Sequence, residues 1–363
     1  MKSVVTILLL LLGLGSIACA ADIPALVQVP AGRYDIGTRV LSGTAGGNAE
    51  DQPAVHNFYD LDAYGIGKTE VSNDALCSIL NWGLQKQRLR IDKAGVLYGD
   101  QVVLDLRSTF CPIAAKGTTL SVRDNLGKYP ATEVTWHGAM VYCALLNEKV
   151  NLPQAVDLQR WTIDVGKSGF RLPTEVEWEA AALGGKPPGF NKKPARPDGF
   201  VVGALLDNVP DGTYNLSSGG EILPCGSLPA HGFGTHDMVG NVWEWCADHY
   251  VSVSVLQYAG SRESWDTNGS KKGKDWTLKK EINILRNPVF DAIHRPELTT
   301  VTGKFAKTPL LDTEYRVQRG GGWTISGGIR EPQNQKFLRR GDRPELSTND
   351  LGFRVARRGK VSN

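Results

Sequence analysis

The sequence predicts an α+β fold that is irregular and rich in loops, and three observations support this prediction. The 363 residues include 41 glycines and 19 prolines, which favour tight turns over long regular elements. Apolar residues recur at helical spacing in three separate segments, whereas strand-like alternation occurs in short runs. Neither an internal repeat nor a linker divides the chain, so we expect one domain over residues 21–363, with insertions near 86–128 and 251–315.

The first expected elements are a strand and a helix. Residues Leu26–Thr38 alternate and then turn at glycine, which predicts a strand or a hairpin. Within Thr69–Leu80, apolar residues recur at helical spacing, and Ser72 or Asn73 can cap the start of the helix. The next segment, residues 86–128, is mixed and charged, and it favours strands joined by long loops.

Two further helices have recognisable N-terminal signals. Thr135 ends the run "PATEVT" and precedes apolar residues at helical spacing, so it is the expected N-cap of a second helix. In "FRLPTEVEWEAAAL", Thr174 and Glu177 have the spacing of a capping box, with alanines and Leu183 continuing a third helix. The capping role also explains Glu177 better than membership of a catalytic carboxylate cluster.

Beyond the third helix the chain changes character. Gly184–Gly234 is dominated by Gly, Pro, Asn and Asp, so long regular elements are not expected there. Val251–Tyr315 is rich in lysine and arginine, with acidic residues interspersed. This segment is either a solvated surface insertion or a basic contact surface for an acidic partner. The net charge of only +3 gives no argument for nucleic acid.

The N-terminus has the pattern of a secretory signal peptide over residues 1–20. A lysine is followed by the apolar run Val4–Leu14, which is too short to span a membrane, and then by the cleavage pattern Ala18–Ala20. We therefore expect export to a bacterial periplasm. Lipidation of Cys19, which would tether the protein there, is the alternative. No later apolar stretch is long enough to span a membrane.

Five cysteines remain after removal of the signal peptide, so at least one thiol is unpaired unless it bonds to another chain. An oxidising compartment permits disulfides. Cys77 and Cys111 flank an irregular stretch and are the pair that we expect to be bridged. Cys143 lies among apolar residues of the second helix, so we expect it to be buried and free.

Several distinctive motifs occur in a definite order along the chain. "FRLPTEVEWEAAAL", "GFGTHDMVGNVWEW", "RGGGW" and "NDLGFRVARR" follow the earlier "VPAGRYDIGT", "KTEVSN" and "PATEVTWHGAMVYC". Together they resemble the formylglycine-generating enzyme superfamily, also called sulfatase-modifying-factor domains, over most of Val27–Arg358. The resemblance implies an irregular, loop-rich α+β fold related to C-type lectins, which agrees with the glycine and proline content.

The resemblance also implies where catalytic chemistry would lie. The generating enzymes bind copper through two cysteines that follow the RGG motif, and copper(I) favours such soft thiolate ligands. In this chain Ile325 and Arg330 stand at those positions, Gly322 replaces the usual serine, and no cysteine follows Cys246. Neither replacement can supply a thiolate. We therefore expect no formylglycine generation, no catalytic residues and no bound organic cofactor.

Calcium is the cofactor that the resemblance implies. Family members hold one ion with side chains and carbonyls at the positions matching Glu70, Asp237, Gly240, Val242 and Glu244. Oxygen ligands of this kind suit a hard cation. A second site of the family matches here only at Asn208 and Val209. The alternative for the first site is a set of metal-free carboxylates that accept backbone N–H groups.

Two kinds of family member fit an exported chain without the cysteine pair. Some are regulators, and one of these promotes type VI secretion through a receptor threonine kinase. The expected partner is then the periplasmic sensor domain of a membrane receptor kinase. Another member is a periplasmic oxidoreductase of siderophore maturation, which works without the cysteine pair and is the alternative. Arg339, Arg340 and Arg343 match an arginine-rich segment that lines the family's substrate groove or holds the C-terminal loops.

Overall fold

The computed structural model describes the chain in several stretches. These are residues 23–35, 58–184, 222–227, 230, 232–238, 240–250, 315–323 and 339–360. Several predictions fall outside the described residues. They concern the signal peptide, most of the basic insertion, and Asn208, Val209, Ile325 and Arg330. Among the described residues, no helix is long and apolar enough to cross a membrane.

Each of the three described helices begins at a residue that the sequence indicated. Their bounds are Asn73–Gln85 (α1), Trp136–Lys149 (α2) and Glu175–Leu183 (α3). The side-chain oxygens of Ser72, Thr135 and Thr174 each accept a backbone N–H of the first turn. At α3 the Glu177 carboxylate also accepts the backbone N–H of the capping residue, at 2.9 Å, which confirms the capping box.

A three-stranded antiparallel sheet joins the two ends of the described chain. It has the order β1-β4-β16, from Leu26–Val29 (β1), Tyr64–Gly67 (β4) and Ala356–Arg358 (β16). Beside it, Gly32–Asp35 (β2) pairs with Phe58–Leu61 (β3). The prediction of a strand near the start is confirmed. The hairpin alternative is wrong, because β1 and β2 each pair with a later strand.

The sheet that carries the "WEW" motif has four strands in the order β14-β13-β12-β15. They are Trp243–His249 (β12), Arg316–Arg319 (β13), Arg339–Asp342 (β14) and Leu351–Gly352 (β15). Strands β12 and β15 are parallel and the other pairs are antiparallel. Directly paired residues share a face of a sheet, so Trp245, Gln318 and Arg340 lie on the same face.

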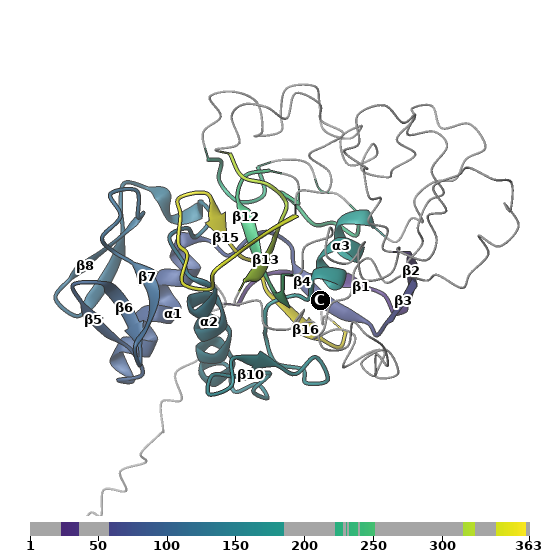
Figure 1. Cartoon of the computed structure of the whole chain (residues 1–363), viewed down its shortest axis with the longest axis horizontal. Coiled ribbons are helices and arrows are strands. Elements are labelled where there is room, and N and C mark those ends of the chain that lie inside the picture. The colour runs from purple at the N-terminus through teal and green to yellow at the C-terminus, as the bar shows by residue number, and fades with distance from the viewer. Residues whose placement is uncertain are drawn as a thin grey trace, which may run out of the picture.

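The predicted first insertion forms a lobe of short strands. Residues Arg90–Asp92 (β5), Gly95–Tyr98 (β6) and Gln101–Asp105 (β7) make one sheet, and Ile113–Lys116 (β8) and Thr119–Val122 (β9) make a hairpin. A 3-10 turn at Leu126–Lys128 (η3) follows. Figure 1 shows the lobe beyond α1, with α2 between it and β12–β16. The expected long loops are wrong within the hairpins, because Gly99 and Gly117 adopt positive φ and permit two-residue turns.

Helix α2 is almost wholly buried. Its start packs against β7, where a Cβ on Gly138 would come within 2.0 Å of the Val103 carbonyl oxygen. Glycine is therefore required for this close approach. On the other side, the Trp136 indole donates a hydrogen bond of 2.9 Å to the Cys246 carbonyl in β12. A short hairpin, Val156–Asp157 (β10) and Thr162–Ile163 (β11), follows the helix.

The five described cysteines all have free thiols. The predicted bridge between Cys77 and Cys111 is therefore wrong: both side chains are buried as apolar groups in the same hydrophobic core cluster. The prediction that Cys143 is buried and free is confirmed. Burial raises the pKa of all five thiols, to about 11 for Cys111. Such thiols are poor nucleophiles and poor metal ligands.

Candidate functional site

A cluster of buried carboxylates lies where the early "EVSN" segment meets β12. We call it the carboxylate cluster, and it comprises Glu70, Asp237 and Glu244, each at most 3% exposed. Like charges in so dry an environment are unfavourable unless a cation compensates them. The structure thus brings together the three carboxylates that the sequence predicted as one site, from segments more than 160 residues apart.

Glu244 is neutralised by an arginine that the sequence analysis did not assign to the site. Both Nε and Nη2 of Arg354 donate to the Glu244 carboxylate, each at 2.6 Å, and the pair is fully buried. The Trp178 indole donates to Oε2 of the same carboxylate at 2.7 Å. The two remaining interactions of Arg354 go to the carbonyls of Gly67 and His236 at 3.0 Å. Glu244 is therefore held in a complete bidentate ion pair.

Glu70 and Asp237 are less completely satisfied. One oxygen of Glu70 accepts from the Asn241 side chain at 2.9 Å, and one oxygen of Asp237 accepts from the Gly226 backbone N–H at 2.5 Å. The other oxygens, Glu70 Oε2 and Asp237 Oδ1, are buried without a hydrogen-bond partner. Burial and the nearby Asp237 charge hold the pKa of Glu70 well above its usual value, although Arg354 acts in the opposite direction.

These two orphaned oxygens fit a hard cation, which prefers carboxylate and carbonyl ligands. The oxygens of Glu244 are already used by Arg354 and Trp178. In the described part of the chain, no group of three His, Cys, Asp or Glu side chains has an arrangement that could hold a metal. Gly240 and Val242 both lie in the bend directly before β12. Calcium at Glu70 and Asp237 therefore stays a prediction, and backbone carbonyl oxygens would have to complete the coordination shell of the ion.

A second polar cluster lies on one face of the four-stranded sheet. We call it the arginine–tryptophan face, comprising Trp243, Arg316, Gln318 and Arg340, with Trp136 and His137 of α2 beside it. The Arg340 guanidinium stacks on the Trp243 ring at 4.2 Å, and that of Arg316 stacks on the Trp136 ring at 4.0 Å. Arg340 also donates to the Gln318 side-chain oxygen.

Several polar atoms of this face are buried without partners. They are Trp243 Nε1, Arg316 Nε, Gln318 Nε2 and His137 Nδ1. The first three can only donate hydrogen bonds. Burial lowers the pKa of Arg316 to about 10 and also lowers the pKa of Arg340, but both stay charged at neutral pH. A ligand that supplies acceptor oxygens would satisfy these donors and remove the cost of leaving them unpaired.

His137 should make stability depend on pH. Burial and the charge of Arg316 lower the pKa of His137 to about 4. Below pH 6.5 the unfolded chain therefore takes up a proton that the folded chain does not, and the free energy of unfolding falls as pH drops from about 6.5 to 4. His137→Phe keeps the ring contacts with Trp136 and Trp161. Over this pH interval, the free energy of unfolding should fall by about 1–3 kcal/mol less in the variant than in wild type, as measured by urea unfolding. An unchanged pH profile would contradict the assignment.

The glutamates of α3 serve the fold. Glu177 forms a buried pair with Arg171, and Arg319 of β13 approaches Glu175 at 3.4 Å and Glu179 at 2.8 Å. Pairing with arginine stabilises their charged forms inside the protein. Arg171, Arg319 and Arg354 were not predicted from the sequence as partners of these buried carboxylates. An arginine inside an otherwise apolar run, as in "LGFRVA" and "GFRLP", is the signal that could have found two of them.

The comparisons with known proteins agree with this architecture. The family model for the sulfatase-modifying factor enzyme 1-like domain matches residues 15–359. The formylglycine-generating enzyme of Mus musculus is 25% identical over 281 residues, covering 70% of this chain and 64% of the mouse protein. This chain thus spans less than two thirds of that enzyme. The inactive C-alpha-formylglycine-generating enzyme 2 of Bos taurus is 26% identical, covering 66% of this chain and 76% of the bovine protein.

Two further comparisons extend the range of relatives. The serine/threonine-protein kinase pkn1 of Chlamydia caviae is 28% identical over 214 residues, covering 59% of this chain and 27% of the kinase. The crystal structure of CarF shares the fold, with a TM-score of 0.51, 19% identity, and coverage of 93% of this chain and 100% of that one. With a family model matching nearly the whole chain, this protein belongs to the formylglycine-generating enzyme-like, sulfatase-modifying-factor family.

Proposed function

We propose that the protein is an exported binding and regulatory factor that does not generate formylglycine. The observation that carries this proposal is the absence of cysteine from the positions where the family resemblance expects it. The family's two copper-binding positions hold Ile325 and Arg330, and no cysteine follows Cys246. The described thiols are buried or half-buried, with raised pKa values, so none offers a ready thiolate in exchange.

The bovine relative is named as an inactive member of the family, which supports a non-catalytic role. The chlamydial relative is named as a serine/threonine-protein kinase, which supports a connection of such domains with kinases. We propose that this chain binds the periplasmic sensor domain of a receptor threonine kinase and thereby promotes type VI secretion, as the regulator TagR does. The predicted export signal would place it in the compartment of that domain.

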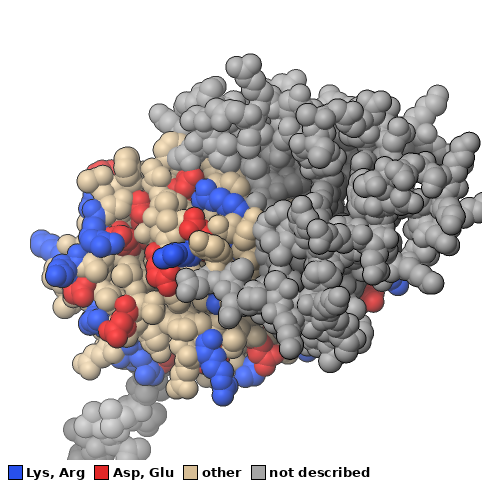
Figure 2. Space-filling view, in the orientation of Figure 1, with Lys and Arg blue, Asp and Glu red and all other residues tan. Residues whose placement is uncertain are grey.

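The arginine–tryptophan face is the surface that we propose for this binding. Its unpartnered donors are buried, so contact with the partner would begin at Arg340, whose side chain is 35% exposed. The positive charge of this guanidinium favours an acidic segment of the partner. Figure 2 shows basic and acidic side chains interspersed over the described part of the visible surface, without one dominant sign. Aromatic and arginine side chains are also the types that most often carry binding energy at interfaces.

Calcium would support this role by fixing the scaffold. We propose that the ion bridges Glu70, after β4, and Asp237, before β12, by means of their unpartnered oxygens. It would neutralise charge that Arg354 leaves uncompensated, and would join an early segment of the chain to a late one. The calcium would then stabilise the domain and take no part in a reaction.

The binding proposal is tested with Arg340→Ala. This change removes the guanidinium that stacks on Trp243 and is partly exposed. We expect about a tenfold or greater loss of affinity for the kinase sensor domain, measured by calorimetry with purified proteins. Arg90→Ala, which removes an exposed arginine from the first insertion, is the matched control and should bind as wild type does.

Wild-type binding by folded Arg340→Ala would remove the arginine–tryptophan face as the binding surface. The proposed function itself would be contradicted by oxidation of a sulfatase peptide, or of a siderophore precursor, by the purified protein with a redox metal bound stoichiometrically. That result would favour the periplasmic oxidoreductase alternative.

A further inference from the structure

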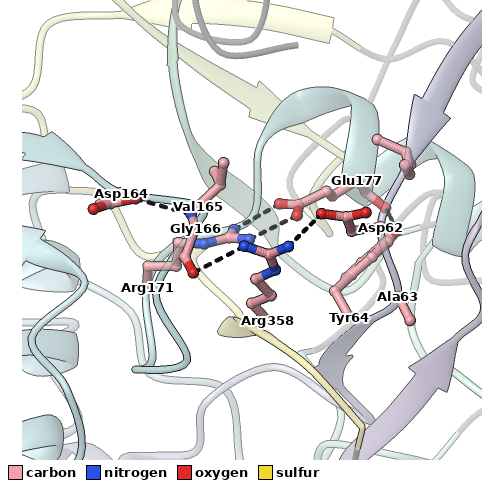
Figure 3. A pocket seen from close by; sticks show the side chains of 10 residues that line it. Asp62, Ala63, Tyr64, Asp164, Val165, Gly166, Arg171, Glu177 and Arg358 are labelled. Atoms are coloured by element: carbon pink, nitrogen blue, oxygen red, sulfur yellow. Dashed lines mark hydrogen bonds and ion pairs between the residues drawn. The ribbon is translucent and has the colours of Figure 1, made fainter.

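A cavity of about 250 Å³ shares no residue with the carboxylate cluster or with the arginine–tryptophan face. It is lined by the turn between β3 and β4, the loop after β11, the start of α3 and strand β16. Figure 3 shows charged side chains of both signs converging on it from these elements. Its size suits a ligand as small as an amino acid rather than a drug-sized molecule.

The floor of the cavity is a buried ion pair with one unused donor. Arg171 binds Glu177 through two hydrogen bonds of 2.6 and 2.7 Å, and Arg171 is 1% exposed. The Tyr64 hydroxyl donates to the main-chain carbonyl of Glu177 at 2.6 Å. Arg171 Nε remains buried without an acceptor. An acceptor oxygen placed in the cavity would satisfy this N–H.

The mouth of the cavity is spanned by an arginine of this same chain. Arg358 donates to Asp62 Oδ2 at 2.7 Å and to the Gly166 carbonyl at 3.1 Å, so it connects the two rims (Figure 3). The side chains of Arg358 and Asp62 are 46% and 70% exposed. Exposed ion pairs contribute little to stability, so this contact can be exchanged at low cost.

The charges around the cavity favour a cation. Three carboxylates line it, from Asp62, Asp164 and Glu177, against the two guanidinium groups of Arg171 and Arg358. Lys167, outside the lining, forms only an exposed 3.9 Å ion pair with Asp164. Displacement of Arg358 from the mouth would leave Asp62 and the Gly166 carbonyl without their donor. A simple anion would be repelled by the excess negative charge. A guanidinium or ammonium group, by contrast, would replace Arg358 and form the same hydrogen bonds.

We propose that this cavity binds a small organic cation that carries a hydrogen-bond acceptor at its other end. Its guanidinium or ammonium group takes the place of Arg358 between Asp62 and the Gly166 carbonyl. A carbonyl or hydroxyl oxygen accepts the unused N–H of Arg171. The ligand class is therefore an amino-acid amide or an amino alcohol, and the site is independent of the proposed kinase partner.

The test uses L-argininamide as the probe and the full chain, with affinity measured by calorimetry. Arg358→Ala removes the internal competitor, so this variant should bind the probe at least tenfold more tightly than wild type. Adding Asp62→Asn to that variant should weaken binding by at least tenfold, because the mouth loses its carboxylate. Arg90→Ala removes another exposed arginine of an ion pair and should retain wild-type affinity.

A second probe tests the floor of the cavity. Agmatine has the same guanidinium and no carbonyl, so it should bind Arg358→Ala several-fold more weakly than L-argininamide. Equal affinity would contradict the role of Arg171. Absence of binding to Arg358→Ala at millimolar probe would overturn the whole proposal. So would an affinity that the added Asp62→Asn change leaves unaltered. Circular dichroism establishes that the variants are folded, and Arg358→Gln, which preserves side-chain bulk, replaces Arg358→Ala if that variant unfolds.

Discussion

Replacing Arg354 with methionine is expected to lower the free energy of unfolding by about 3–5 kcal/mol. The side chains of Arg354 and Glu244 are both 0% exposed, so the change would leave a carboxylate buried without its cation. It would also remove the donors to the Gly67 and His236 carbonyls. The measurement is urea unfolding followed by circular dichroism, at constant calcium concentration.

Two controls separate the buried charge from other effects. Arg88→Met breaks an exposed ion pair with Glu148, and it should leave the stability nearly unchanged. The double variant Glu244→Gln with Arg354→Met should recover at least half of the lost stability, since the carboxylate that lost its cation is also removed and Trp178 keeps an acceptor. A single Arg354→Met variant as stable as Arg88→Met would show that Glu244 is compensated by something other than Arg354.

Calcium is expected to stabilise the folded chain by about 2.7 kcal/mol when its concentration is 100 times the dissociation constant. The expectation rests on the unpartnered oxygens of Glu70 and Asp237, and on the burial of Glu70 beside the Asp237 charge, which raises the pKa of Glu70. Glu70→Gln should abolish the calcium effect. Without calcium the same variant should be more stable than wild type, because one buried negative charge has been removed while an acceptor for Asn241 remains.

The experiment compares unfolding in a chelator with unfolding in calcium, alongside metal analysis of the purified protein. Asp100→Asn removes a fully exposed carboxylate and is the matched control, which should respond to calcium as wild type does. If the purified protein contains no calcium, and chelation leaves the melting temperature unchanged, then Glu70 and Asp237 do not form a calcium site.

Local signals in the sequence predicted the helices well. Ser72, Thr135 and Thr174 each act as an N-cap through their own side chain, so a few adjacent residues suffice to locate the helix start. The hairpin alternative at Leu26–Thr38 was wrong for the opposite reason. The partners of β1 and β2 lie further along the chain, and strand pairing is not a local property.

The candidate sites were likewise predictable only where short sequence motifs define them. Motif order identified Glu70, Asp237 and Glu244 as neighbours, but the charge that compensates Glu244 comes from Arg354, 110 residues further along the chain. The arginine–tryptophan face was missed apart from Arg340, because it needs the register of three strands to place Arg316, Gln318 and Trp243 on one face. The cavity at Arg358 also draws on four separate segments.

The sequence by itself therefore determined the family and the helix starts, and its motifs named the carboxylates that meet near β12. These properties depend on residue identity and short-range spacing. The replacement of the family's copper-binding cysteines by Ile325 and Arg330 stays a prediction. Only the tertiary structure decided that Glu244 pairs with Arg354, that Cys77 and Cys111 stay apart as core residues, and that Arg358 spans a cavity. Buried charges and thiols are governed by the groups that packing brings beside them, and those groups are distant in the chain.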